Sequence, residues 1–373
     1  MRHRIRYRRI TAPDAVDLGE ATPGTVALAS YTVKGRVQVV TCTAEEVLRV
    51  WDADTGALLV GPFQALPDAS RHALLGEAAR SLTCLDIDGG PRLVSSLNID
   101  SVQLWDPEEG HLVRHPVQFS DSPRPVVAVL GLETASGPRL AVAEDGHIHL
   151  IDATTGKSDA PPLELVGHRV VALETLPSRA GNTLLVAGSS DGTIRAWCPD
   201  SGERVGRDVQ VSPEFTTLLP FIPDGGGLAV AVLDQDLECW SLDSGSLLHS
   251  WEANWNAAMA DLPGVGPVAI SVDSGGRATV WHIRAGEEIV TLGTEPGSGL
   301  RSAFPAGDHL ALDFHDRIEL WEPHGWRRVT TVSPRRPGSA SEVANVLSLL
   351  ALPDGRLALG LEDGWAVVDF TQA

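Results

Sequence analysis

Lysine, cysteine and long apolar runs are scarce in this sequence of 373 residues. Lys34 and Lys157 are the only lysines, so arginine supplies nearly all of the positive charge. No stretch of about 18 uncharged apolar residues occurs, which argues against a membrane-spanning helix. The arginine-rich start, residues 1–9, leads into no apolar segment, and it therefore does not read as a secretory signal. A cytoplasmic location is the expectation.

The few cysteines predict neither a metal site nor a disulfide framework. Cys42, Cys84, Cys198 and Cys239 lie at least 41 residues apart, each in a run typical of a β-strand. Zinc sites and small disulfide-rich domains need much closer spacing. Free, buried thiols in a reducing cytoplasm are therefore expected.

Motifs for enzymatic chemistry are also missing. There is no nucleophile elbow, phosphate loop, zinc site, EF-hand or dinucleotide-binding pattern. The glycine-rich residues 223–227 lack the Lys-Ser/Thr of a phosphate loop and indicate a turn. His147 and His149 share one strand face, but no third metal ligand is evident. We therefore predict no catalytic residue, no metal and no cofactor.

Charge of one sign dominates. The 49 acidic residues outnumber the 29 basic ones, which gives a net charge of −20. The acids are spread along the chain, so the charge argues against nucleic acid as a partner and for a basic one. The excess of arginine over lysine, with abundant Ala, Gly, Pro and Asp, is typical of proteins from GC-rich bacterial genomes.

What the sequence does contain is a repeat. Eight segments share alternating apolar residues that lead into a large anchor residue, and the anchors recur every 40 to 54 residues. The anchors are Trp51, Trp105, Ile151, Trp197, Trp240, Trp281, Trp321 and Val368.

Each unit predicts four short antiparallel strands. A glycine follows the anchor by five residues in six units and by four in the seventh (Gly325), where a hairpin turn requires positive φ. A second, acidic turn precedes the anchor strand, as in residues 144–146 and 190–192. Such units bury both faces by stacking around an axis. The predicted fold class is all-β, a closed β-propeller of four-stranded antiparallel blades with eight blades, seven being the alternative.

The pattern resembles WD40 repeats. Trp-Asp occurs literally at residues 51–52 and 105–106, and the best copy spans residues 165–202. The resemblance covers essentially the whole chain, residues 1–373, although single copies are degenerate. In the WD40 family a buried network joins a Gly-His histidine, a strand Ser or Thr, a turn aspartate and the anchor Trp. The resemblance places that structural network here at His168, Ser189, Asp191 and Trp197.

The two ends of the chain predict how the ring closes. The eighth unit ends without an outer strand, whereas residues 2–10 alternate Arg with His, Ile and Tyr. We interpret residues 2–10 as the missing outer strand of the last blade. A rival interpretation of the arginine run is binding to nucleic acid or an anionic membrane. Residues 61–80 and 333–346 are the two long inter-blade loops.

One group of residues stands out as a candidate partner site. The turn between the second and third strands is acidic in most blades, and acids occupy it or its immediate neighbourhood, which would put them on one face: Glu45, Asp100, Asp145, Asp191, Asp234, Asp273, Asp316 and Asp363. Ordinary turn chemistry is the favoured explanation, because Asp and Gly suit such turns, and binding of a basic partner is the alternative, in which Asp191 keeps its structural role. Trp255, after an outer strand, is either an exposed anchor for a partner or a filler between blades.

By analogy with WD40 proteins, the expected function is a non-catalytic scaffold or regulatory module that recognises a protein or peptide, acts as a monomer and binds neither nucleic acid nor membrane. The alternative is an enzyme or small-molecule binder that uses the central channel. Residues 52–56 and 152–156 superficially match the D-x-x-T-G turns of quinone-cofactor dehydrogenases, but at 51–52 Trp precedes Asp as in WD40 units. A third possibility is a regulatory domain encoded beside a catalytic partner.

Overall fold

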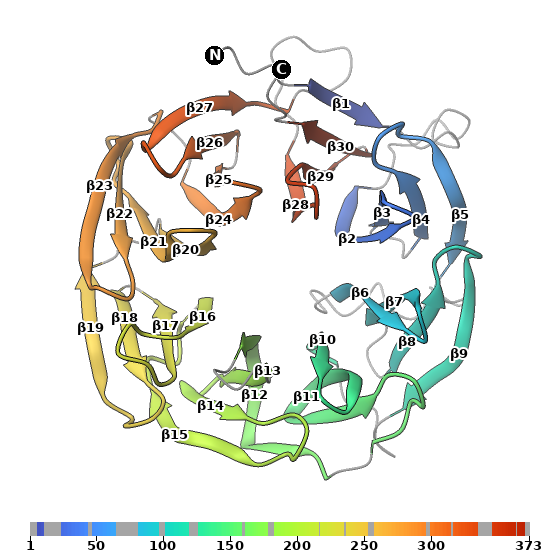
Figure 1. Cartoon of the computed structure of the whole chain (residues 1–373), viewed down its shortest axis with the longest axis horizontal. Coiled ribbons are helices and arrows are strands. Elements are labelled where there is room, and N and C mark those ends of the chain that lie inside the picture. The colour runs from blue at the N-terminus through green and yellow to red at the C-terminus, as the bar shows by residue number, and fades with distance from the viewer. Residues whose placement is uncertain are drawn as a thin grey trace.

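Within the residues that the structure describes, the regular structure consists of β-strands (Figure 1). The computed structural model describes residues 6–10, 24–43, 47–64, 81–96, 101–118, 126–158, 161–177, 183–215, 217–234, 236–252, 257–295, 299–314, 316–334, 345–362 and 364–369. No helix in that part of the chain is long and apolar enough to cross a membrane.

The strands form eight antiparallel blades of four strands each. The first two are separate sheets: blade 1 has β2 (Thr25–Val33), β3 (Arg36–Thr43), β4 (Val47–Asp52) and β5 (Leu58–Gln64), and blade 2 has β6 (Ser81–Ile87), β7 (Gly90–Ser96), β8 (Ser101–Asp106) and β9 (His111–Gln118). Blades 5 to 7 are likewise separate: β16 (Thr217–Phe221), β17 (Ala229–Leu233), β18 (Asp236–Ser241) and β19 (Leu247–Glu252); β20 (Ala257–Leu262), β21 (Gly266–Val272), β22 (Arg277–His282) and β23 (Glu287–Gly293); β24 (Leu300–Ala306), β25 (His309–Phe314), β26 (Ile318–Glu322) and β27 (Arg327–Val332).

Blades 3 and 4 share a continuous strand. Blade 3 contains β10 (Ala128–Thr134), both halves of β11 (Gly137–Asp152) and the first part of β12 (Leu163–Pro177). The second part of β12 is the innermost strand of blade 4, where it pairs with β13 (Thr183–Ser189), followed by β14 (Thr193–Trp197) and β15 (Arg204–Gln210). The chain thus passes from the rim of one blade to the centre of the next without a loop.

Blade 8 is built from both ends of the chain. It combines β28 (Val346–Ala351), β29 (Leu357–Leu361) and β30 (Gly364–Asp369) with β1 (Arg6–Ile10) as its outermost strand. In the register of β1 and β30, Tyr7 lies opposite Val368 and Ile10 opposite Trp365. Residues 2–5 lie outside the described residues. The predicted fold class is confirmed, with eight blades rather than seven.

The burial of each strand depends on its place in the blade. The second strands β17 and β29 are buried at every position, because neighbouring blades cover both of their faces. The outer strand β15 is mostly exposed. Of the predicted long loops, residues 61–64 belong to β5 and Val346 begins β28, while residues 65–80 and 335–344 lie outside the described part.

Eight hydrophobic clusters fill the eight junctions between blades, one for each neighbouring pair. The junction of blades 8 and 1 contains Trp51 and Trp365, whose ring centroids are 5.9 Å apart. The same junction is bridged by Ser348 Oγ, which donates to the Thr25 carbonyl at 3.0 Å. The seam between the ends of the chain is therefore packed like any other junction.

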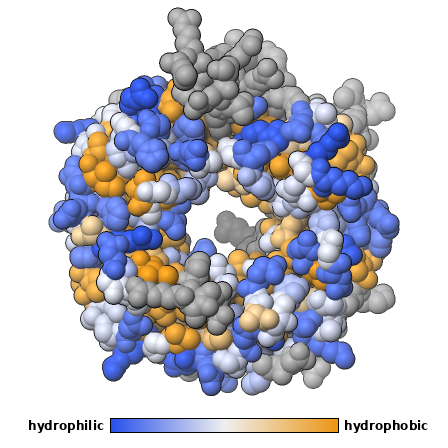
Figure 2. All heavy atoms as spheres, in the orientation of Figure 1, coloured by the Kyte–Doolittle hydropathy of each residue, from blue (hydrophilic) through white to orange (hydrophobic). Residues whose placement is uncertain are grey.

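The innermost strands surround an open central channel (Figures 1 and 2). Because the strands of a blade alternate in direction, its turns fall on two faces. We call upper the face with the turns between second and third strands and the connections to the next blade. The lower face holds the other two turns of each blade. The sequence-predicted acidic turns are therefore on the upper face.

Candidate functional site

The Trp-Asp dipeptides belong to lower-face turns. Asp52 Oδ1 accepts hydrogen bonds from Thr55 N at 2.6 Å and Asp54 N at 3.0 Å, and Gly56 closes the turn at φ 71°. Burial by itself would raise the pKa of Asp52, but the hydrogen bonds from Thr55 and Asp54 outweigh it and lower that pKa. This aspartate therefore shapes a turn rather than serving a ligand.

The seventh unit departs from the expected glycine. The residue with left-handed backbone there is Trp326 at φ 49°, five positions after Trp321, and not Gly325. The prediction for Gly325 is wrong, because the turn geometry fixes the position and not the residue type. The strain of a bulky residue in this conformation is offset by packing, since Trp326 contacts the cluster between blades 6 and 7.

The glycine of these turns has a second use, close contact with the preceding blade. A Cβ on Gly286 would lie 2.8 Å from His249 Nδ1 of blade 5. A Cβ on Gly110 would lie 2.7 Å from a methyl group of Val60 in blade 1. The outer strand of one blade therefore lies on the turn of the next.

The predicted network of blade 4 is present in part among the described atoms. Ser189 Oγ donates to Asp191 Oδ1 at 2.5 Å, and Asp191 also accepts from Thr193 N at 3.0 Å and Thr193 Oγ1 at 2.9 Å. The side chain of His168 lies outside the described residues. Among the described atoms no hydrogen bond joins Ser189 to Trp197, which packs between blades 3 and 4.

Sequence reasoning missed a related contact in other blades. The indole of Trp51 donates to Thr41 Oγ1 at 2.9 Å, and that of Trp105 donates to Ser95 Oγ at 3.1 Å. Each hydroxyl stands ten residues before its tryptophan, a spacing that the sequence displays. The corresponding residue before Trp197 is Ala187, which has no hydroxyl.

The acidic turns differ in what their carboxylates contact. Those of Asp191 and Asp273 hold their own turns together, Asp273 Oδ1 accepting from Gly275 N at 2.9 Å and from Arg277 N at 2.8 Å. Asp316 pairs with Arg317 at 2.9 Å. Asp234 Oδ1 is buried without a hydrogen-bond partner among the described residues. Glu45, Asp100 and Asp363, and the side chain of Asp145, lie outside the described part.

Blade 7 carries a buried ion network on the upper face. Arg317, 3% exposed, donates through Nε to Oε1 of the fully buried Glu319 at 2.9 Å. Its Nη2 donates to the Glu295 carbonyl in the connection from blade 6, and its guanidinium lies 4.1 Å from the ring centroid of Phe314. Glu295 N in turn donates to Glu319 at 3.1 Å. The network fastens the inter-blade connection to the turn.

Apolar side chains are exposed at the upper mouth of the channel. Four innermost strands contain a β-bulge where their pairing with the second strand of the blade begins, and the bulged residues are Val26, Val171, Arg301 and Leu347. Val171 and Leu347 are 42% and 41% exposed. The guanidinium of Arg301 donates to the Val346 carbonyl at 2.7 Å, which ties blade 7 to blade 8. We call these four the mouth residues.

The aromatic site predicted after β19 is only partly described. Trp255 lies outside the described residues. Trp251 and Trp281 have ring centroids 6.2 Å apart at the junction of blades 5 and 6, where they line a small apolar cavity with Leu237 and Ala269. These two tryptophans thus fill a gap between blades.

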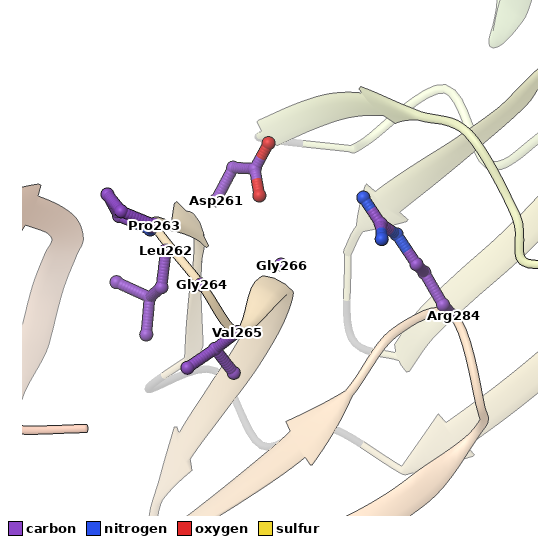
Figure 3. A pocket seen from close by; sticks show the side chains of 7 residues that line it. All are labelled: Asp261, Leu262, Pro263, Gly264, Val265, Gly266 and Arg284. Atoms are coloured by element: carbon purple, nitrogen blue, oxygen red, sulfur yellow. The ribbon is translucent and has the colours of Figure 1, made fainter. Parts of the chain in front are cut away.

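The lower face has a shallow cleft of about 490 Å³ beside the first turn of blade 6 (Figure 3). Asp261 and Arg284 extend from opposite sides of the turn Pro263–Gly266, and their charged ends point toward each other (Figure 3). The Arg284 guanidinium lies over Gly266, where an added Cβ would approach its Cζ to 3.4 Å. The cleft is wide open to solvent.

The described residues contain no group of three or more His, Cys, Asp or Glu side chains that could hold a metal ion. All four cysteines are free. Burial raises the pKa of Cys84 and of Cys239 to about 12, so both are protonated thiols at neutral pH.

Comparison with known proteins shows the fold and nothing finer. No family model matches the sequence, and no curated protein matches it either. The chain is similar to the crystal structure of the computationally designed protein Ika8, with a TM-score of 0.64 and 20% identity over 94% of this chain and 98% of that one. It is also similar to Sqt1 of Saccharomyces cerevisiae, a WD40 protein, with a TM-score of 0.68 and 13% identity over 95% and 97%.

Proposed function

We propose that this propeller is a non-catalytic scaffold or regulatory module that recognises a protein or peptide on its upper face. The observation that carries the proposal is the exposure of Val171 and Leu347 at the channel mouth. Exposed apolar side chains lose contact with water only when a partner covers them, and rigid strands hold these two in place.

The charge of the molecule favours a basic partner. The net charge of −20 attracts cationic segments over distances of about 10 Å at moderate salt. Several upper-face acids are already engaged, Asp316 by Arg317 and Asp273 by its own turn. Attraction therefore comes from the whole acidic surface, while the mouth residues supply the contact area.

The test compares two pairs of substitutions. Partners are captured from the native cell on the immobilised full-length protein, identified, purified and measured by calorimetry. Val171→Ser with Leu347→Ser should weaken binding about tenfold or more, because each removes an apolar anchor. The control pair, Leu59→Ser with Leu247→Ser, changes equally apolar residues, each 46% exposed, on outer strands of the rim. Loss of binding in the rim pair and not in the mouth pair would overturn the proposal.

A further inference from the structure

Strand register shows which residues of the eight innermost strands lie at the same height along the central channel, and we call this height a level. In blade 4 the anchor Trp197 lies opposite Leu185 on β13, and the next residue, Val186, lies opposite Glu174 on β12. In every other blade, too, the residue that follows the one opposite the anchor pairs with one residue of the innermost strand, and that residue is the equivalent of Glu174. In blade 3 the Ala153 N–H donates to the Pro138 carbonyl at 3.0 Å, which sets the register there. The equivalent residues are Ala29, Thr83, Leu130, Leu219, Ala258, Phe304 and Leu350.

Glu174 is the only ionisable residue at this level. Six of the seven equivalents are apolar and contact the junction to the following blade. An acid at a position that packing fills with apolar side chains lowers stability, and such departures from the fold's own pattern are where functional residues are expected.

The carboxyl group of Glu174 faces the channel. The residue is exposed, yet it lies in the middle of an innermost strand, with β13 on one side and neighbouring blades on both faces. The innermost strands border the open central channel (Figures 1 and 2), and we infer that its solvent is what this side chain reaches. Half-buried Leu130 of blade 3 and Leu219 of blade 5 lie at the same level on the innermost strands β10 and β16, which both contact β12.

In the part of the chain that the structure describes, no positive group pairs with this carboxylate. Among the described residues, neither a hydrogen bond nor an ion pair to Glu174 occurs, and the strands packed beside it, β13 and β16, carry no ionisable side chain. The charged residue on the same part of β12 is Arg169, toward its upper end, and the one on β10 is Glu133, toward its lower end. Surrounding protein raises the pKa of Glu174 to about 7 by desolvation.

We propose that the central channel binds a ligand that carries one positive charge on an apolar chain, with the Glu174 carboxylate as partner of the charge and the Leu130 and Leu219 side chains of the neighbouring blades as partner of the chain. An alkylammonium group meets this description, as a small amine or as the lysine side chain of an entering peptide. A carboxylate without a partner gains most from a cation in surroundings of low polarity. This site does not depend on the upper-face partner.

The experiment titrates the full-length protein at pH 8 with hexylammonium and, separately, with the peptide acetyl-Leu-Lys-Leu-amide, using calorimetry. Glu174→Gln should weaken binding about tenfold or more, the loss expected for one charge-assisted hydrogen bond. The matched control Glu133→Gln, on the innermost strand of the neighbouring blade, should bind as the parent does. At pH 5.5 the parent should bind as weakly as Glu174→Gln, because the carboxyl group is then protonated.

The two probes distinguish the sources of the ligand. Binding of hexylammonium alone assigns the site to a small amine, and binding of the peptide assigns it to a lysine side chain. Binding of neutral hexanol with the same affinity as hexylammonium would overturn the proposal, since the charge would then not be recognised. The proposal would also be overturned if neither probe showed saturable binding, or if a folded Glu174→Gln variant bound them as tightly as the parent does.

Discussion

In blade 1 the anchor Trp51 bonds to a strand hydroxyl, that of Thr41. The WD40 resemblance places a contact of this kind only in blade 4. Thr41→Val keeps the shape of the side chain and leaves the buried indole N–H without an acceptor. The free energy of unfolding should fall by about 1–3 kcal/mol, measured by chemical denaturation. Thr32→Val, an exposed change on the same blade, is the control and should be nearly neutral. Equal stability of the parent and Thr41→Val would contradict this assignment.

Glu174 makes stability depend on pH. Its pKa is raised to about 7 in the folded protein, so the folded state binds this proton more tightly than the unfolded chain does. The resulting stabilisation is complete below the ordinary glutamate value of 4.5 and is lost as the pH rises through about 7. Glu174→Gln should therefore melt roughly 1–3 °C higher than the parent at pH 8, with little difference at pH 5. Calorimetric scans at both pH values test this, and the effect is small because channel water screens the charge.

At the scale of single residues, sequence patterns predicted the turns better than the polar contacts. The spacing of Gly286 after Trp281 follows from turn geometry, which is local. The left-handed Trp326 could not be predicted, because its strain is offset by packing against another blade. The Ser189–Asp191 contact lies within one turn and was expected. The hydroxyl partner of Trp51 instead lies on the neighbouring strand β3, two residues after Val39, which pairs with Trp51.

At the scale of elements, the buried ion network in the turn between β25 and β26 should contribute to the free energy of unfolding. Arg317→Met would leave the buried carboxylate of Glu319 without its main partner, and unfolding should become about 3–5 kcal/mol easier. The exposed pair of Arg327 with Glu322 provides the control, since Arg327→Met should cost less than about 1 kcal/mol. Urea denaturation of both variants gives the comparison.

A double substitution decides whether the charge or the packing matters in that turn. Arg317→Met combined with Glu319→Leu removes both members of the pair and should recover much of the lost stability. If the double variant is no more stable than Arg317→Met, the contact between Arg317 and Phe314 carries the stabilisation instead.

Element boundaries were less predictable than element number. Eight anchor residues predicted eight blades, because each blade buries its faces only against its neighbours. The continuous strand β12 was not predicted, because the repeat pattern marks where each blade's anchor lies and not where the outer strand of one blade ends and the next blade begins. The β-bulges at Val171 and Leu347 were missed as well, because each follows the first residue that pairs with the second strand of its blade and leaves too short a stretch before it for the shift in apolar alternation to be recognised.

At the scale of the whole molecule, the pairing of β1 with β30 completes the ring. Deletion of residues 1–12 would expose the edge of β30 and remove the outer strand of blade 8. The melting temperature should fall and aggregation should increase, as seen by scanning calorimetry and light scattering. A truncated protein that is as stable and as soluble as the parent would show that the ring does not need this strand.

The acidic surface predicts how partner binding responds to salt. Asp145→Asn, Asp234→Asn and Asp363→Asn together reduce the upper-face charge and leave the structural bonds of Asp191 and Asp273 intact. Binding of a captured basic partner should weaken in this triple variant, and it should depend less on salt than binding by the parent does. Calorimetry at two salt concentrations measures both. Unchanged affinity would leave these residues with turn formation as their role.

The pairing of β1 with β30 also sets the order of events when the chain is made. A ribosome adds about 5–20 residues per second, so roughly 20–70 s separate the appearance of Arg6 from that of its partner Asp369. During this interval blades 1 to 7 can stack in order of synthesis, each on the one before. Blade 1 meanwhile lacks a neighbour on one side, and Trp51 remains uncovered until Trp365 arrives. Until β30 emerges, the nascent protein is therefore an open spiral, and its uncovered first blade can be covered by its own chain or by another one.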